Sequence, residues 1–178
     1  MRIHRVSEEV AVAKGLTADF KDHVLTIKGP KGTITRRFFH PRVKMTISGG
    51  KITVEAGEVT RREKALVGTW AAHSRNMMKG VTEPFLYRMK AVYAHFPIKM
   101  QVKGTELLIE NFLGEHHPRH ASILGDTKVT VKGQELELSG TSLELVGQTA
   151  ANIENATRVR DRDPRVFQDG IFITSKGE

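Results

Sequence analysis

Three histidines around one arginine, in the run His116-His117-Pro118-Arg119-His120, are the residues with the clearest capacity for chemistry. Imidazoles so close together could bind zinc or copper and serve a metal-dependent enzyme. A structural zinc site needs four ligands at defined spacing, however, and no second ligand cluster accompanies this run. The same side chains on a proline-stiffened loop suit RNA phosphates and 2′-hydroxyls, and an ordinary solvated loop is the third alternative. We predict RNA contact by His116, His117, Arg119 and His120, and no metal.

A second basic run holds four arginines within eight residues: Arg158, Arg160, Arg162 and Arg165. Aspartates at 161 and 163 interleave with them, so a salt-bridged surface loop is the plain interpretation. Surface ion pairs contribute only about 0–1 kcal/mol each, which makes stability a weak reason for such density. Arginine also binds phosphate through two parallel hydrogen bonds. We therefore favour RNA contact by these four arginines.

Scattered basic residues elsewhere are further candidates for phosphate contact. Lys31, Arg36 and Arg37 flank a predicted hairpin, where solvated strand edges guarded by charge are an equal alternative. Lys176, close to the C-terminus, is the last candidate. The run Gly29-Pro30-Lys31-Gly32 lacks the strand, G-x-x-x-x-G-K-[ST] loop and helix of a nucleotide site, so it predicts a turn.

Catalytic patterns do not stand out in this sequence. There is no cysteine, which excludes disulfides, thiolate metal sites, iron–sulfur clusters and cysteine nucleophiles. No serine or threonine sits in a nucleophile-elbow motif. We expect no enzymatic activity, no cofactor and no small-molecule substrate.

Positive charge is concentrated in parts of the chain. The formal net charge is +8, which calls for a polyanionic partner, nucleic acid before an acidic membrane surface. Residues 1–103 hold 20 Lys and Arg against 8 Asp and Glu, residues 104–157 hold 3 against 8, and residues 158–178 hold 5 against 4. This asymmetry predicts a basic face rather than a uniformly basic surface.

Targeting signals are not evident. The N-terminal residues 1–9 lead into no apolar stretch, so we expect no signal peptide. No segment approaches the ~20 apolar residues that a membrane helix needs. We therefore expect a cytoplasmic protein without a membrane partner.

An internal repeat organises the whole sequence. Residues 66–77 align with residues 145–156 at an offset of 79, with six identical pairs among twelve. Apolar positions upstream align as well, at offsets of 84 and 82, and the shift falls between elements, where loops tolerate length changes. The chain is therefore predicted to be a duplication.

Each copy shows strand patterns followed by one helix. In the first copy, strands are predicted over 24–28, 32–37, 43–47 and 52–54, around turns at Gly29-Pro30-Lys31-Gly32 and Gly49-Gly50. A capping box at Thr60 and Glu63 opens a helix that Gly80 should stop, and residues 85–93 follow as a closing strand. Leu66, Trp70, His73 and Met77 form its predicted buried face.

The second copy shows the same order. Apolar residues alternate at 98–102, 129–131 and 136–138, and Thr141 and Glu144 offer a second capping box. Its predicted helix face is formed by Val146, Ala150, Ile153 and Thr157, and residues 166–174 predict a hairpin around Asp169-Gly170. We predict an α+β fold of two tandem duplicated domains, residues 1–83 and residues 84–178 with a C-terminal hairpin, each a mostly antiparallel β-sheet packed against one α-helix.

Three segments resemble a known family: residues 94–98 (AHFPI), residues 110–115 (ENFLGE) and residues 165–173 (RVFQDGIFI). They are similar to the ribosomal protein family numbered six in the large subunit, in its archaeal and eukaryotic branch, and the length favours an archaeal member. Val67-Gly68-Thr69 and Val146-Gly147-Gln148 stand where the two helices of that family begin. Phe172 departs from the family, which usually has tyrosine there.

The resemblance implies a structural protein that braces large-subunit rRNA beside the sarcin–ricin loop, near the docking region of translation GTPases. Its implied partners are that rRNA and neighbouring large-subunit proteins, with the GTPases nearby. In that family the second domain makes much of the rRNA contact, which the low charge of residues 104–157 would confine to local basic clusters. A free-standing RNA-processing or His-metal enzyme and a DNA-binding protein are the alternatives.

Overall fold

Alternating apolar residues and two-residue turns form six strands in the first half of the chain. The computed structural model describes residues 3–163 and 165–177, and the chain divides into the units Met1–Pro84 and Phe85–Glu178. One sheet of the first unit has the order β1 (Ile3–Ala11), β6 (Lys51–Val59) and β5 (Val43–Ser48). The other has the order β2 (Thr17–Lys21), β3 (Val24–Gly29) and β4 (Gly32–Arg37). All pairings are antiparallel, as predicted.

Both predicted turns of the first unit are present. Gly29 pairs with Gly32, which leaves Pro30 and Lys31 as the turn between β3 and β4. Gly49 and Gly50 join β5 to β6, and both have positive φ, 57° and 75°. Side chains rarely adopt that conformation, so two glycines suit this turn.

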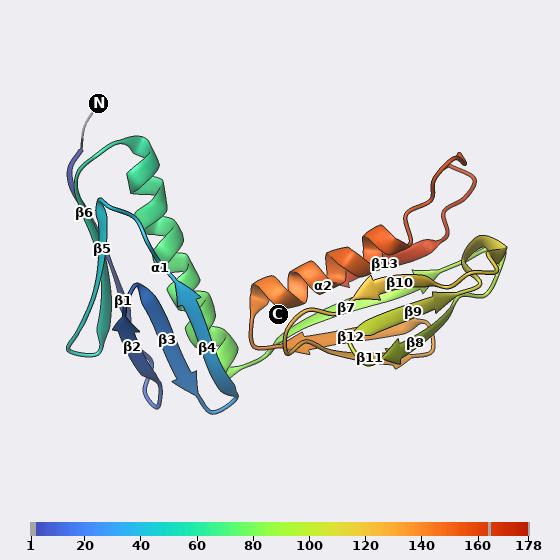
Figure 1. Cartoon of the computed structure of the whole chain (residues 1–178), viewed down its shortest axis with the longest axis horizontal. Helices are drawn as coiled ribbons and strands as arrows, with labels where there is room; N and C mark the ends of the chain where they lie inside the picture. Colours follow the sequence, from blue (N-terminus) through green and yellow to red (C-terminus); the bar gives the residue numbers. More distant parts are fainter. Residues whose placement is uncertain (1–2, 164, 178) are drawn as a thin grey trace. The chain divides into compact units, whose positions relative to one another are not determined.

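Helix α1 (Arg61–Thr82) follows β6 and packs on the sheets of its unit (Figure 1). The predicted capping box is confirmed, with Thr60 as the N-cap and Glu63 accepting from its backbone N–H. Gly80 does not end the helix. It is buried within the last turn, and the helix continues to Thr82. Glu83 N–H still donates to Lys79 O at 2.7 Å, and Pro84 then prevents continuation.

The buried face of α1 differs in part from the predicted one. Trp70 and Met77 are buried, whereas Leu66 and His73 are half-buried at its margin. The inward positions beside Trp70 and Met77 are taken by smaller residues and one further methionine: Val67, Ala71, Ser74, Met78 and Val81.

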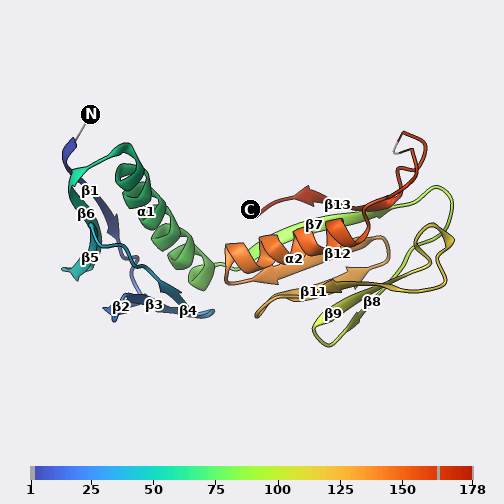
Figure 2. The same cartoon turned by 45° about the horizontal axis from the view of Figure 1, so that its top comes forward.

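The second unit repeats this arrangement with one additional strand. Its four-stranded sheet has the order β11 (Lys128–Lys132), β12 (Glu135–Gly140), β7 (Phe85–Val92) and β13 (Gly170–Ser175). Its three-stranded sheet has the order β10 (Arg119–Ser122), β9 (Glu106–Glu110) and β8 (Lys99–Lys103), and a single 3-10 turn, η1 (Phe112–Gly114), follows β9. Figure 2 shows α2 (Leu143–Ala156) lying across this unit.

Three sequence predictions for the second unit are wrong. The strand beginning at Phe85 does not close the first copy, because β7 pairs with β12 and β13. Helix α2 is capped by Ser142, whose side chain accepts from Leu145 N–H, rather than by a Thr141–Glu144 box. Residues 166–169 are not a strand, so the C-terminal hairpin is replaced by β13 pairing with β7.

The two cores use equivalent residues. Aligned positions of the repeat are completely buried in both units: Leu25, Ile27, Ile52 and Val54 in the first, and Leu107, Ile109, Leu136 and Leu138 in the second. The predicted face of α2 is also confirmed, since Val146, Ala150, Ile153 and Thr157 are all buried. No helix within residues 3–163 and 165–177 has the length and apolarity required to cross a membrane.

Thr157 joins α2 to β13, and its replacement by valine tests this link. The Thr157 hydroxyl accepts a hydrogen bond from Ile171 N–H at 3.0 Å, and it is 3.2 Å from Glu154 O. Thr157→Val has a similar shape but leaves a buried N–H without an acceptor, so we expect a loss of about 1–3 kcal/mol. Chemical denaturation measures the loss. Thr174→Val, at an exposed position of β13, is the control and should change stability little.

Candidate nucleic-acid interface

The structure brings the two predicted basic runs together at one end of the second unit. We call residues 116–120 the histidine loop and residues 158–165 the arginine loop. Arg119, at the start of β10, donates hydrogen bonds to Ala156 O at 2.9 Å and to Arg158 O at 3.1 Å. Segments about 40 residues apart in sequence therefore adjoin at the C-terminal end of α2.

Arg119 is the side chain that holds this junction. Its guanidinium also donates to the carboxylate of Glu115 at 2.8 and 2.6 Å, and lies 4.2 Å from the ring centre of Phe112. Most N–H groups of the guanidinium are therefore bonded to acceptors within the protein, and the side chain is only 24% exposed. Arg119 therefore positions both loops, whereas the sequence pattern alone predicts RNA contact for it.

Glu115 is the acidic partner in this arrangement. The hydrogen bond from Arg119 is the main reason that the pKa of the Glu115 carboxyl lies below its ordinary value, and the positive charges of Arg119 and Arg162 add to this effect. At neutral pH the carboxylate is therefore charged.

The remaining basic side chains of the two loops face solvent. His116, His117 and His120 are exposed, as are the four arginines of the arginine loop. Arg160 and His120 line a shared shallow hollow of about 320 Å³ with Asn155. His120 lies 2.9 Å from Glu106, at the adjacent strand. Exposed side chains of both loops thus form one surface, rather than two separate clusters.

A stack of flat side chains supports the arginine loop. The guanidinium of Arg162 lies 4.7 Å from the ring centre of Phe167, and that ring stacks on His95 at 4.9 Å. His95 in turn lies 3.3 Å from Asp169, whose carboxylate also accepts from Ala94 N–H. Asp169 is buried, which explains why the Asp169-Gly170 pair does not serve as a hairpin turn.

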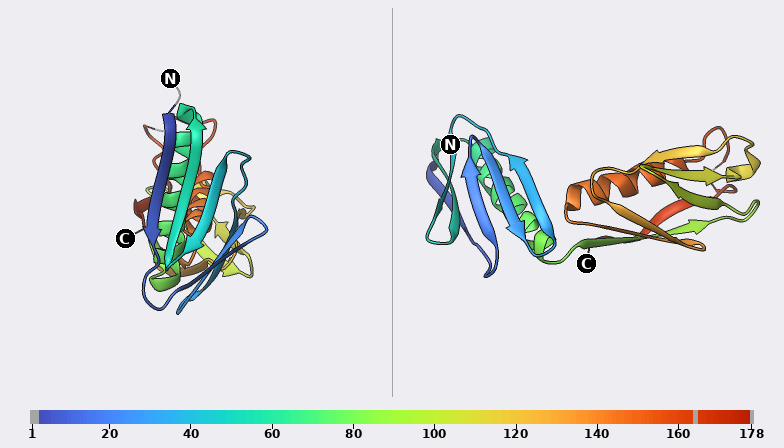
Figure 3. Two further views of the ribbon diagram at one scale, coloured as in Figure 1. Left: turned by 90° about the vertical axis from the view of Figure 1, so that its left-hand side faces the viewer. Right: turned by 60° about the horizontal axis from the view of Figure 1, so that its bottom comes forward.

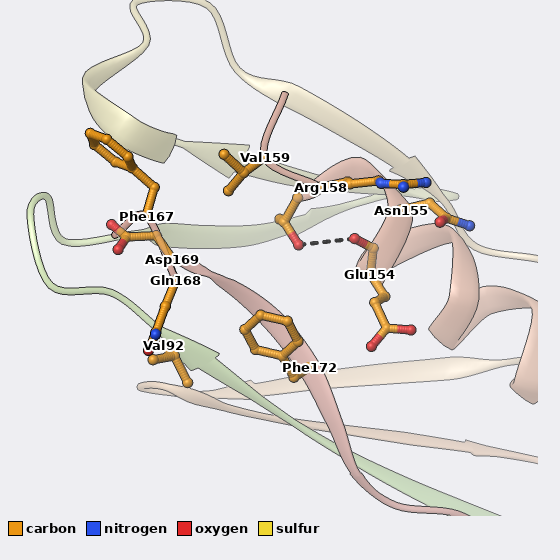
Figure 4. A pocket seen from close by; sticks show the side chains of 10 residues that line it. Val92, Glu154, Asn155, Arg158, Val159, Phe167, Gln168, Asp169 and Phe172 are labelled. Carbon is orange, nitrogen blue, oxygen red and sulfur yellow. Dashed lines mark hydrogen bonds between the residues drawn. The ribbon is translucent and has the colours of Figure 1, made fainter. Parts of the chain in front are cut away.

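A groove opens beside this stack, between the end of α2 and β13 (Figure 4). Its volume is about 800 Å³. Val92 and Phe172 contribute exposed apolar surface to it, each 44% exposed, and Asn155, Arg158 and Gln168 line it with polar groups. Sequence reasoning did not identify this groove, because its walls come from β7, α2 and β13. These elements are far apart in sequence, so no short motif brings their residues together.

The three segments that carry the family resemblance gather in this region. Phe167 and Asp169 contact residues 94 and 95, as described above. Asn111 donates to Pro97 O at 3.1 Å, and a Cβ at Gly114 would lie 3.3 Å from the ring of Phe96. Phe172, the departure from the family, points into the groove where a tyrosine would add a hydroxyl.

The other predicted contact residues lie on other elements, Lys176 within the second unit and Lys31, Arg36 and Arg37 within the first. Lys176 follows β13, a strand about 20 Å long, and therefore lies at the opposite end of the second unit. Lys31 is in the turn before β4, while Arg36 and Arg37 are at the end of that strand. Arg36 lies 3.3 Å from His73, and Arg37 lies over the exposed ring of Phe39.

The histidine loop is the part of the chain whose residues could be metal ligands. Within residues 3–163 and 165–177, no group of three histidine, aspartate or glutamate side chains is placed to hold an ion. His120 faces Glu106, and the histidine loop is open to solvent.

Arg119→Lys tests the positioning role. Lysine keeps the charge but cannot bridge Glu115, Ala156 O and Arg158 O together, so we expect a loss of about 1–3 kcal/mol in unfolding free energy. Amide hydrogen exchange should also accelerate in residues 156–162. Arg165→Lys, at an exposed position of the arginine loop, is the matched control. Unchanged exchange in Arg119→Lys would contradict the role.

Acid stability tests the same contact through Glu115. Its folded-state pKa is lowered, so its contribution is complete above the unfolded-state pKa and is lost as pH falls through the folded-state value. Glu115→Gln has no carboxyl group to protonate, so its stability should fall less than that of the unmodified protein as the pH is lowered. Denaturation midpoints between pH 7 and about pH 3 measure it. Glu110→Gln, at an exposed position on β9, is the control.

Comparison with known proteins identifies a family over both repeats. A family model described as Ribosomal protein L6 matches residues 12–84 and again residues 96–170, one match in each repeat. A protein of Methanocella arvoryzae named large ribosomal subunit protein uL6 is 53% identical over 169 residues, covering 94% of this chain and 96% of its own length. Proteins of the same name from Methanosarcina mazei and Haloarcula marismortui are 45% and 43% identical and cover 98% and 94% of this chain, and 99% and 94% of their own lengths. These relatives confirm the predicted archaeal resemblance, and the chain belongs to the ribosomal protein L6 family.

Proposed function

We propose that the protein is a structural constituent of the large ribosomal subunit in the cytoplasm, where it binds and braces rRNA. Membership of the ribosomal protein L6 family supports a structural rather than a catalytic role. The observation that carries the proposal is the surface at the end of α2, where the histidine and arginine loops adjoin through Arg119. It offers exposed cations on a rigid support.

The mechanism follows from the chemistry of these side chains. Arg158, Arg160 and Arg162 are exposed and can each neutralise an rRNA phosphate. Histidine side chains beside them can donate to phosphates or 2′-hydroxyls. Arg119 and the stack on Phe167 hold the loops in place, so less conformational entropy is lost on binding.

The finer placement of the protein is part of the same proposal. We place the bound rRNA beside the sarcin–ricin loop, with translation GTPases docking nearby and other large-subunit proteins as neighbours. The family resemblance supports this placement. The basic residues of the first unit, Lys31, Arg36 and Arg37, remain proposed as additional rRNA contacts.

Charge reversal of Arg158, Arg160 and Arg162 to glutamate tests the proposal. Each phosphate contact contributes about 0.7–0.9 to the slope of log affinity against log salt, so the variant should lose about two to three from that slope. Affinity for large-subunit rRNA should also fall steeply at low salt. Salt-dependent binding measurements on the folded full-length protein give both values.

A matched variant controls for net charge. Arg88, Lys103 and Lys128 are exposed on β7, β8 and β11, outside both loops, and their reversal to glutamate changes the total charge equally. The control should retain most of the salt slope. Equal losses in the two variants would contradict a localised interface, and comparable affinity for duplex DNA would favour the alternative of a DNA-binding protein.

A further inference from the structure

The outer edge of β1 is unpaired in the first unit. β1 bonds to β6 on one side, and within residues 3–163 and 165–177 no strand pairs with its other side. The left view of Figure 3 shows β1, the darkest blue strand, at the margin of its sheet. An open strand edge is a template for a further extended segment.

The register identifies which backbone groups face outward. Val12 N–H donates to Gly50 O at 2.8 Å, in line with the register of β1 and β6. Residues that bond to the partner alternate along an antiparallel strand. The N–H and C=O groups of Ser7, Glu9 and Ala11 therefore point away from β6.

The second repeat contains the equivalent edge. Ile52 of β6 pairs with Val10, and the aligned Leu136 of β12 pairs with Met89. Each residue of β1 thus corresponds to the residue of β7 79 positions later, the same offset that aligns the two helices. β7 occupies the place of β1.

Two glycines give independent support for this correspondence. A Cβ at Gly68 of α1 would lie 3.4 Å from the carboxylate of Glu8, and one at Gly147 of α2 would lie 3.5 Å from the hydroxyl of Tyr87. Glu8 and Tyr87 are equivalent under the offset of 79, and so are the two glycines.

In the second repeat this edge is covered. β13 pairs antiparallel with β7, and Gly177 N–H donates to Leu86 O at 3.2 Å. Leu86 and Lys90 are the equivalents of Ser7 and Ala11, whose backbone groups are open in the first repeat. The chain therefore shows, in its own second copy, how an extended segment adds to this edge.

We propose that the β1 edge binds an extended segment of a neighbouring large-subunit protein as an added antiparallel strand. This inference rests on the proposed function for the presence of such neighbours. Main-chain hydrogen bonds to Ser7, Glu9 and Ala11 supply the binding, as in β-strand addition generally.

The charges on β1 favour a polypeptide over RNA. Arg5 pairs with Glu55 at 2.6 Å, Glu9 with Lys51 at 2.9 Å, and Glu8 with Arg75 at 2.9 Å. The edge therefore has no positive excess to attract phosphates. Arg5 and Glu9 are exposed four residues apart, so a segment with an acidic residue opposite Arg5 and a basic residue opposite Glu9 fits best.

Photo-crosslinking in assembled large subunits tests the proposal. A benzophenone amino acid is placed at Ser7 or Glu9 of the full-length chain, and at Thr46, exposed on β5, as the control. We expect adducts from both β1 positions on one peptide of a neighbouring protein, two residues apart and in reversed order. Adducts on rRNA alone, on a second copy of the chain, or none at all would overturn the proposal.

A proline variant gives a second readout. Ser7→Pro removes an outward N–H without removing a bond to β6, a change that edge strands tolerate. The yield from the Glu9 probe should fall about fivefold or more, while Ser7→Ala leaves it unchanged. An unchanged yield in Ser7→Pro would also overturn the proposal. A chain that fails to sediment with large subunits overturns the proposed function itself, which separates the two failures.

Discussion

The candidate interface depends on one side chain, Arg119 of β10. Its guanidinium binds backbone carbonyl oxygens at the C-terminal end of α2. The last turn of a helix leaves carbonyl oxygens without partners, and here Arg119 satisfies Ala156 O while it also binds Arg158 O. Because Glu115 and the ring of Phe112 fix the guanidinium from the other side, the histidine and arginine loops become one surface. A cation that holds the two loops together thus leaves the arginines of the arginine loop exposed.

Duplication gave the two repeats one core and different edges. Equivalent leucine, isoleucine and valine residues are completely buried in both, which maintains the same sheets and helix. The second repeat adds β13 to the edge of β7, and the segment that leads into β13 contains the arginine loop. In the first repeat no strand of the described residues pairs with the equivalent edge, at β1. The same fold can therefore contact different partners through its margins.

Much of the fold could be predicted because burial leaves a periodic pattern. The alternation at Leu25, Ile27, Ile52 and Val54 and the repeat itself indicated the sheets, and Thr60 with Glu63 indicated where α1 begins. β1 escaped prediction because Glu8, on its inward face, interrupts the apolar alternation and pairs instead with Arg75. The β2–β3 hairpin was missed because its turn, residues 22 and 23, has positive φ without glycine.

The candidate site was predictable in composition but not in assembly. Basic loops are visible in sequence, whereas the contacts of Arg119 and the stack on Phe167 join residues far apart along the chain.

Ultraviolet crosslinking of native large subunits, with nucleotide adducts mapped by mass spectrometry, tests the central claim most directly. The account predicts rRNA adducts on both the histidine loop and the arginine loop in the same subunits. Adducts confined to other parts of the second unit would contradict it.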